Sequence, residues 1–361
     1  MMLSQENFND LKEKGYTVVG NVLTEEECDQ TIAKYREWLS NFKEGEWPYS
    51  SYSLIQRYNT GNMEPTWFVR LKSKKVFAEI WKTDKLLSSV DAIAIGRPPE
   101  DGEELFHRPG DHWLHLDQSA EREGLHAYQG AVYLETADED DWTLHVMESS
   151  HLHFEEFIKS NEKVAIKSMM NGFYSLRDEQ VKHFSQLGCT LRRVPVPKGG
   201  MVLWDSRLVH ANAGVVKGRK NPGRWRFCVF VSMTPAIWAN EEDLKVKREA
   251  YNEVRMTTHW SSQGVGMFKT HIPSYSPQDV EYPREHSDIS KTDEAKRLCG
   301  VLPYDFNDGQ PNCDFFPEWN ELSPRGSGRR KRRYMRVGLI ILAGIASAVS
   351  LVIMRRIVRS N

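Results

Sequence analysis

The fold of this chain is decided by the stretch Val194-Pro-Val-Pro-Lys-Gly-Gly-Met-Val-Leu-Trp-Asp-Ser-Arg-Leu-Val209, which leads directly into His210. The stretch reads as a short strand, a Lys-Gly-Gly turn and an apolar strand with the histidine at its far end. Two other segments, Gln129-Gly-Ala-Val-Tyr-Leu-Glu135 and Arg226-Phe-Cys-Val-Phe-Val-Ser232, are rich in β-branched and aromatic residues and also predict strands. Successive strands of this kind indicate a β-rich core.

A candidate metal site accompanies these strands. Of three His-x-Asp/Glu triplets, only His115-Leu-Asp117 stands next to strand-like sequence and has a distal histidine, His210, that opens onto another strand. Two imidazoles and one carboxylate on one face of a ferrous ion leave coordination positions open for an organic acid and O2. The alternative is a hydrogen-bonded histidine in a polar loop.

Ligands that come from separate strands fit a double-stranded β-helix, in which strands far apart in sequence meet at one barrel mouth. We therefore predict a β-rich α+β fold, a cupin-like jelly roll with flanking helices. Amphipathic patterns predict two of these helices, over residues 25–42 with Thr24 as the N-cap and over residues 241–254. With 40% apolar residues, the chain is long enough for one domain with a sizeable core, which we place at residues 1–318.

Three ordered segments resemble the phytanoyl-CoA dioxygenase superfamily of iron- and 2-oxoglutarate-dependent oxygenases. Gly15-Tyr-Thr-Val-Val-Gly-Asn-Val-Leu-Thr-Glu-Glu26 is similar to the opening strand and helix of that family. His115-Leu-Asp-Gln118 is similar to its first two metal ligands, and Trp204-Asp-Ser-Arg-Leu-Val-His210 to its third. Residues 67–91 and Thr257-Thr-His-Trp260 look closer to a little-characterised branch, which brings no substrate with it.

The resemblance implies that His115, Asp117 and His210 hold Fe(II), with 2-oxoglutarate and O2 as cosubstrates. It also implies that an arginine on the next strand pairs with the distal carboxylate of 2-oxoglutarate. Arg226 is the first candidate because its planar fork can bind a carboxylate through two parallel hydrogen bonds. Arg224 lies two residues earlier, on the same face of an extended strand.

Other residues near the predicted site leave their roles open. Arg207 is a further candidate for binding cosubstrate or substrate, but Asp205 stands two residues away and the two equally suggest a structural ion pair. Thr257-Thr-His-Trp260 follows the last predicted strand, so we expect it to pack a helix or cap and not to touch iron. His107, His112 and His126 are read mainly as solvated loop histidines.

The chain departs from the family pattern in two places. Asp140-Asp-Trp-Thr-Leu-His-Val-Met-Glu-Ser-Ser-His151 keeps the Ser-His end of a core strand but lacks the glycines that usually precede it. Residues 161–191 match the family poorly and are expected to shape the substrate entrance. Because Asp117 is present, halogenation, which needs the carboxylate position vacated for chloride, is not expected, and hydroxylation is the predicted outcome.

A second strong signal lies after residue 336. Residues 337–354 contain no charge over 18 positions, and at about 1.5 Å per residue they would span about 27 Å, close to the hydrocarbon thickness of a bilayer. Basic residues flank this segment, with seven from Arg325 to Arg336 and three after Met354. We predict a basic linker at 319–336, a transmembrane helix at 337–354 and a short basic tail at 355–361.

The charge distribution predicts topology and excludes one class of partner. The excess of basic residues before the span, and the lack of a signal sequence, predict a single-pass C-terminal anchor with the catalytic domain facing the cytoplasm. The endoplasmic reticulum and the mitochondrial or peroxisomal outer membrane are the candidate membranes. Removing the ten basic residues of 325–361 from the total of 48 leaves 38 against 50 acidic ones, a net charge of −12. A domain so acidic is not expected to bind nucleic acid.

The sequence thus predicts a membrane-anchored dioxygenase that hydroxylates a small or lipid-like substrate. A second reading keeps the jelly roll without catalysis, as a membrane-tethered adaptor. The five cysteines are odd in number and scattered without metal spacing, so they read as reduced buried thiols.

Overall fold

Two antiparallel sheets form the core of the computed structural model, which describes residues 2–101 and 112–325. The seven-stranded sheet contains β1 (Tyr16–Val19), β11 (Met201–Asp205), β7 (Tyr128–Tyr133), β13 (Arg226–Pro235), β4 (Ile93–Gly96) and β2 (Leu54–Ile55) in that order, with β3 (Leu86–Ser88) pairing to β13. The five-stranded sheet has the order β10 (Thr190–Val194), β8 (Thr143–Glu148), β12 (His210–Ala213), β5 (His115–Leu116) and β9 (Tyr174–Ser175).

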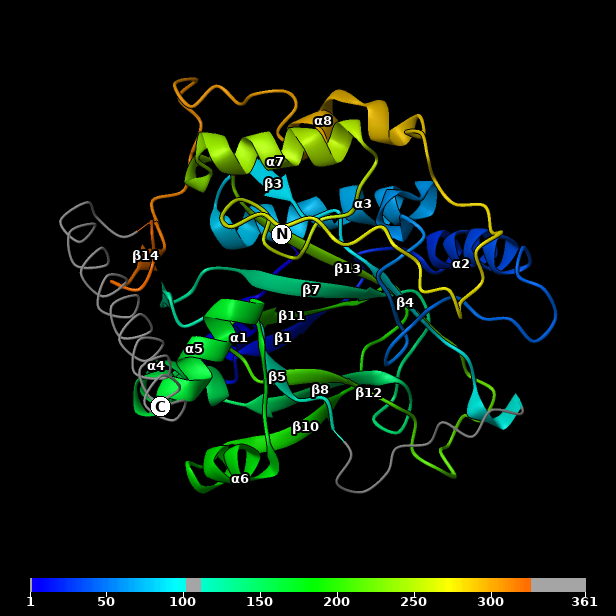
Figure 1. Cartoon of the computed structure of the whole chain (residues 1–361), viewed down its shortest axis with the longest axis horizontal. Helices are drawn as coiled ribbons and strands as arrows, with labels where there is room; N and C mark the ends of the chain where they lie inside the picture. Colours follow the sequence, from blue (N-terminus) through cyan, green and yellow to red (C-terminus); the bar gives the residue numbers. More distant parts are fainter. Residues whose placement is uncertain (1, 102–111, 326–361) are drawn as a thin grey trace, which may run out of the picture.

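The helices lie mainly outside these sheets (Figure 1). They are α1 (Gln5–Glu13), α2 (Glu25–Leu39), α3 (Glu64–Trp81), α4 (Phe154–Ser160), α5 (Glu162–Asn171), α6 (Asp178–Gln186), α7 (Glu241–Asn252) and α8 (Asp293–Leu298). Short 3-10 turns occur at Thr60–Asn62, Pro99–Asp101, Ser150–His153, Ala236–Trp238 and Ile289–Lys291. A separate two-stranded ribbon joins β6 (Arg122–Glu123) to β14 (Glu318–Trp319).

Both faces of the seven-stranded sheet are buried at its central strands. Successive side chains of a strand point to opposite sides, and nearly all of those on β11 and β13 are buried. On β7, Ala131 and Tyr133 join a cluster that includes Leu144 and Val146 of the other sheet, which makes this face the interior of the sandwich. Val132, between them, belongs instead to the cluster formed with the helices, including Phe77 of α3. The fold is therefore a mixed α and β structure with two facing antiparallel sheets, as the sequence predicts.

Local sequence accounts for the helix and turn positions. Thr24 caps α2, since its side chain accepts from the Glu27 amide while the Glu27 side chain accepts from the Thr24 amide. The Lys-Gly-Gly turn before β11 needs its first glycine: Gly199 has φ +73°, and a Cβ there would lie 2.2 Å from the Leu23 carbonyl oxygen. Residues 161–191, which match the family pattern poorly, form α5, β9 and α6. Strand β9 is the edge strand of the five-stranded sheet, and the two helices pack beside this sheet.

The packed part of the chain extends past residue 318, and the predicted transmembrane segment is not described by the structure. The predicted domain end at residue 318 falls inside β14, and Arg325 makes two bonds of 2.7 Å to the Asp243 carboxylate, so the packed part continues through residue 325. The predicted transmembrane segment 337–354 lies outside the described residues. Within residues 2–101 and 112–325, no helix is both long and apolar enough to cross a bilayer.

Candidate metal centre

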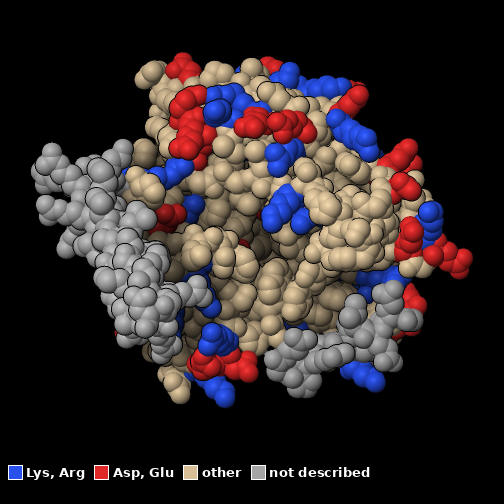
Figure 2. All heavy atoms as spheres, viewed as in Figure 1, with Lys and Arg blue, Asp and Glu red and all other residues tan. Residues whose placement is uncertain are grey.

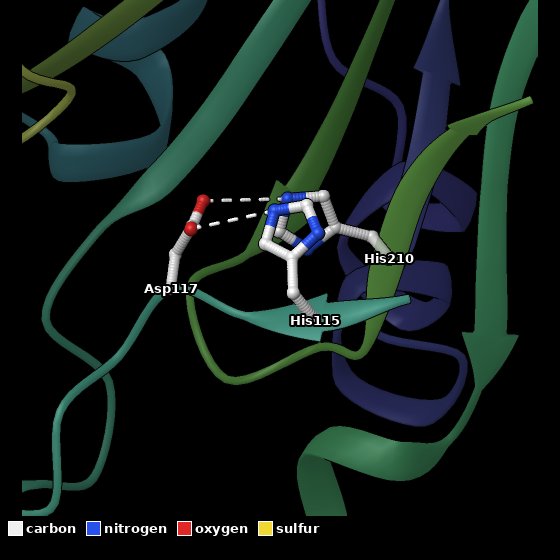
Figure 3. Close-up of side chains that lie close together, drawn as sticks. All are labelled: His115, Asp117 and His210. Carbon is white, nitrogen blue, oxygen red and sulfur yellow. Dashed lines mark ion pairs between the residues drawn. The ribbon is translucent and has the colours of Figure 1, made fainter. Parts of the chain in front are cut away.

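His115, Asp117 and His210 come together at the sandwich interior. Strand β5 carries His115, the turn after it carries Asp117, and β12 carries His210 directly opposite His115 in the strand register. The Nε2 atoms of His115 and His210 lie 3.4 Å from Asp117 Oδ1 and Oδ2 respectively, and one potential ligand atom from each residue falls within 4.8 Å of the others (Figure 3). Metal binding by this group stays a prediction.

Backbone carbonyls set the orientation of both rings. His115 Nδ1 lies 2.7 Å from the Trp113 carbonyl oxygen, and His210 Nδ1 lies 2.9 Å from that of Leu208. Because a carbonyl only accepts, each Nδ1 carries the hydrogen and each Nε2 presents its lone pair to the centre. Gln129 Nε2 donates to Asp117 Oδ2 over 3.1 Å and fixes the carboxylate. Two lone pairs and a carboxylate facing one point form a donor set that suits Fe(II).

Burial and the neighbouring rings keep these groups ready to bind a cation. Burial lowers the pKa of His115 to about 4, so its imidazole is neutral at physiological pH. Burial alone would raise the pKa of Asp117, but His115, His259 and His210 together hold it well below its usual value. The centre is thus an ionised carboxylate facing a neutral ring.

His259 is a neighbour of this centre that the sequence reasoning missed. Its Nδ1 lies 4.0 Å from Asp117 Oδ2, whereas we expected the Thr257–Trp260 segment to pack away from iron. The segment is fastened to the barrel at both ends: Thr257 Oγ1 accepts from the Val90 amide, and Ser261 Oγ donates to the Ser232 carbonyl. The Thr257 amide also donates to the Val90 carbonyl oxygen over 2.9 Å. These are contacts between residues far apart in sequence, so no strand or helix pattern predicts the return.

Arg226 is buried close to this centre without an acidic partner. It is 2% exposed and donates to Ser53 Oγ, Tyr133 Oη and Asn212 Oδ1, each over 3.0 Å. None of the ion pairs found among the described residues includes it, and its Nε has no hydrogen-bond partner there. A buried guanidinium whose described partners are all neutral carries a cost that a bound anion would lower. Asn212 is two residues past His210 on β12, which ties this arginine to the metal centre.

Arg224 and Arg207 already have carboxylate partners. Arg224 pairs with Asp138 at 2.8 Å and Asp141 at 2.6 Å. Arg207 forms two hydrogen bonds to Asp205, of 3.0 and 2.7 Å. The two residues thus form the ion pair that the sequence analysis gave as one of two possibilities. Both arginines thus have acidic partners within the described chain, and their role at the cosubstrate carboxylate stays a prediction. The same-face argument for Arg224 fails because β13 begins only at Arg226.

The other histidines near the triplet differ in their burial and partners. His107 lies outside the described residues, and His112 pairs with Asp178 through Nε2 at 3.0 Å. His126 is not a solvated loop residue: it is 2% exposed, with Nε2 2.6 Å from the Glu318 carbonyl oxygen. All five cysteines are buried and free, as the sequence predicts.

A hollow marks the face seen in Figures 1 and 2. Figure 2 shows it near the middle of this face, over the region where β7 lies in Figure 1, and mostly uncharged residues surround it. Strand β7, which lies in this region in Figure 1, carries Gln129, whose side chain bonds to Asp117.

Comparisons with known proteins agree with the fold. No protein-family model matches the chain. A curated relative, "Ava biosynthesis cluster protein O" from Aspergillus versicolor, is 24% identical over 277 residues, which covers 71% of this chain and 87% of the relative. The chain is similar to GlcNAc Inducible Gene 2, GIG2 (DUF1479), from Candida albicans, with a TM-score of 0.57 and 16% identity over 86% of this chain and 79% of that one. EctD from S. alaskensis, solved with 2-oxoglutarate and 5-hydroxyectoine, is a weaker match, with a TM-score of 0.44 and 12% identity over 79% of this chain and 88% of that one.

The buried imidazoles predict a pH-dependent stability for the metal-free protein. The pKa values of His115 and His259 are both lowered to about 4 by burial, against about 6.5 in an unfolded chain. Below pH 6.5 the unfolded chain binds protons that these folded rings refuse, so the free energy of unfolding falls as the pH falls toward 4. The lowered pKa values of His126 and Asp117 extend this fall below pH 4. Urea denaturation of the chelator-treated protein across this range measures the slope.

The His259→Gln variant is the control for this prediction. It lacks one of the buried rings with a lowered pKa, while His115, His126 and His151 remain, so its stability should fall less steeply than that of the wild type between pH 6.5 and 4. A wild-type unfolding midpoint that stays constant from pH 7 to 4.5 would contradict the assignment of neutral buried rings.

Proposed function

We propose that this chain is a non-haem iron- and 2-oxoglutarate-dependent oxygenase that hydroxylates a small organic substrate. The observation that carries the proposal is the position of Arg226 beside the cluster of His115, Asp117 and His210. Its guanidinium is buried and has no acidic partner among the described residues. These three residues would hold Fe(II), and Arg226 would bind the distal carboxylate of 2-oxoglutarate. Bound iron would supply O2 activation coupled to decarboxylation of 2-oxoglutarate to succinate and CO2.

The chain's own residues prepare the cosubstrate site. Ser53, Tyr133 and Asn212 accept from Arg226 and hold its guanidinium in one orientation before any anion arrives. Burial raises the pKa of Tyr133 to about 12, so its hydroxyl adds no negative charge to compete with a carboxylate. An anion would therefore remove the cost of the buried charge as it binds, which favours the cosubstrate over neutral molecules.

An adaptor role explains these features less well. A module that only binds a partner has no physical need for two lone pairs, a carboxylate and an unpaired buried arginine in one interior. The oxygenase proposal gives each of these groups a task.

Formation of the ternary chelate tests the proposal. Anaerobic titration of the protein with Fe(II) and 2-oxoglutarate should give the weak visible charge-transfer band of the chelate. The Asp117→Ala variant should lose the band because the carboxylate ligand is gone. Folded wild-type protein that shows neither the band nor tight iron binding would refute the proposal.

Exchanging the arginines should separate the cosubstrate ligand from its neighbours. Arg226→Lys should weaken 2-oxoglutarate binding by about ten-fold or more, because a point charge cannot form two parallel bonds to the carboxylate. The matched control, Arg224→Lys, should leave the affinity within about two-fold, since Arg224 serves Asp138 and Asp141. Titration of the charge-transfer band measures both, and equal losses in the two variants would argue against Arg226 as the ligand.

We also propose that residues 337–354 hold the domain at a membrane as a single span, with the domain on the cytoplasmic side. The support is the uncharged run of 18 residues between basic clusters. The proposal concerns location and is independent of the chemistry.

Fractionation of cells tests the membrane proposal. In a eukaryotic host, the full chain should stay in the membrane pellet after an alkaline carbonate wash, because a spanning helix resists extraction. A chain ending at Arg325 should move to the supernatant and still form the iron chelate, and microscopy of the full chain identifies the membrane. Release of the full chain by carbonate would exclude a spanning segment.

A further inference from the structure

A tight hairpin at residues 51–54 adopts a backbone that its sequence does not favour. Ser51 and Leu54 exchange two backbone hydrogen bonds of 3.0 and 2.8 Å. The two residues between them, Tyr52 and Ser53, have φ values of 50° and 65°. Turns with both central residues in the left-handed region usually contain Asn-Gly, because a Cβ crowds the next carbonyl. A strained turn of this kind points to a function for the side chains that it presents.

The two strained residues reach two parts of the candidate site. Ser53 Oγ accepts from Arg226 over 3.0 Å, on the cosubstrate side. The ring of Tyr52 stacks on Trp113, with centroids 4.9 Å apart and planes inclined by 8°. Trp113 in turn packs against His115, with centroids 4.4 Å apart. The hairpin thus ends a column of three rings that starts at a candidate metal ligand.

A further aromatic ring approaches His115 from the strand beside it. Phe173 directly precedes β9, which pairs with β5 through His115 and Ser175. Its ring stands edge-on to His115, with centroids 6.4 Å apart and planes at 89°. Tyr52 and Phe173 are 39% and 42% exposed, respectively, which is unusual for large rings so near a buried centre. Exposed apolar surface of this kind marks binding sites.

We propose that Tyr52 and Phe173 form the substrate-recognition surface of this site, and that the substrate presents a flat unsaturated ring to them. This inference rests on the proposed oxygenase function, whose substrate class it names. A planar ring gains offset stacking or edge-to-face contact with both residues, and a saturated ring of the same size gains only the burial of apolar area. The strain of the hairpin keeps Tyr52 on Trp113 while Ser53 holds Arg226, so one turn positions groups for both substrate and cosubstrate.

A matched pair of small probes tests the inference on the full chain without iron. Benzyl alcohol and cyclohexylmethanol have similar size and the same hydroxymethyl group, but only the first has a π face. In ligand-observed NMR titrations, wild-type protein should bind benzyl alcohol about five-fold more tightly than cyclohexylmethanol. Tyr52→Leu and Phe173→Leu should each reduce this preference to about two-fold or less. Both side chains are exposed, so the variants should fold.

Tyr275→Leu is the matched control, because Tyr275 is an exposed ring, at 80%, that packs against Tyr49 and not against Trp113 or His115. This variant should keep the wild-type preference. Equal binding of the two probes to wild type would overturn the inference, as would an undiminished preference in both the Tyr52→Leu and Phe173→Leu variants.

The iron titration keeps this outcome separate from the proposed function. Loss of the ring preference in variants that still form the iron and 2-oxoglutarate chelate would support a substrate surface in a working site. Absence of the chelate band in a wild-type protein that prefers the flat ring would refute the oxygenase proposal, and with it the assignment of the ring surface to a substrate.

Discussion

The register between β12 and β5 is the constraint on which the candidate site depends. The two strands meet at a single pair, His210 opposite His115, and β5 is only two residues long. Because side chains alternate along a strand, a slip of one residue would turn the imidazole of His210 to the other face. The same strand carries Asn212, which accepts from Arg226, so the candidate metal ligands and the candidate carboxylate-binding arginine are positioned together. Pairing of β12 with β8 over four residues secures it.

The arginines of the interior differ in their partners. Arg219 bonds to Asp141 and Glu100, and the half-buried Arg207 bonds to Asp205, whereas the fully buried Arg70 donates to the Gly61 carbonyl oxygen and forms no ion pair among the described residues. Arg226 is surrounded by a hydroxyl, a phenol and an amide instead. The cost of leaving a charge without a partner is large enough that a fold retains it only with compensation. The proposed anion site at Arg226 therefore depends on its place beside the candidate metal ligands, because burial without an acidic partner among the described residues is shared with Arg70.

The sequence predicts what repeats locally and misses what depends on long-range returns. Apolar runs predicted the strands that became β7, β11 and β13, and Thr24 marked the start of α2 correctly. The His-x-Asp spacing and the distal histidine identified His115, Asp117 and His210, which the structure places side by side. His259 was missed because a few long-range hydrogen bonds of Thr257 and Ser261, and no periodic pattern, hold its segment against Val90 and Ser232. The arginines could not be ranked because sequence does not show where β13 begins or which acids lie nearby.

The fastening of the last described residues has a mechanical consequence. Arg325 grips the Asp243 carboxylate, and Asp243 Oδ1 also accepts from the Gly264 amide, just beyond the segment that carries His259. Nearby, β14 pairs with β6 through two residue pairs, and Asn320 donates to the Ala120 and Glu121 carbonyl oxygens. A pull on the chain beyond residue 325 would load these contacts and the ion pair first. Strands β5 and β12, which hold the histidines of the candidate metal centre, take no part in them.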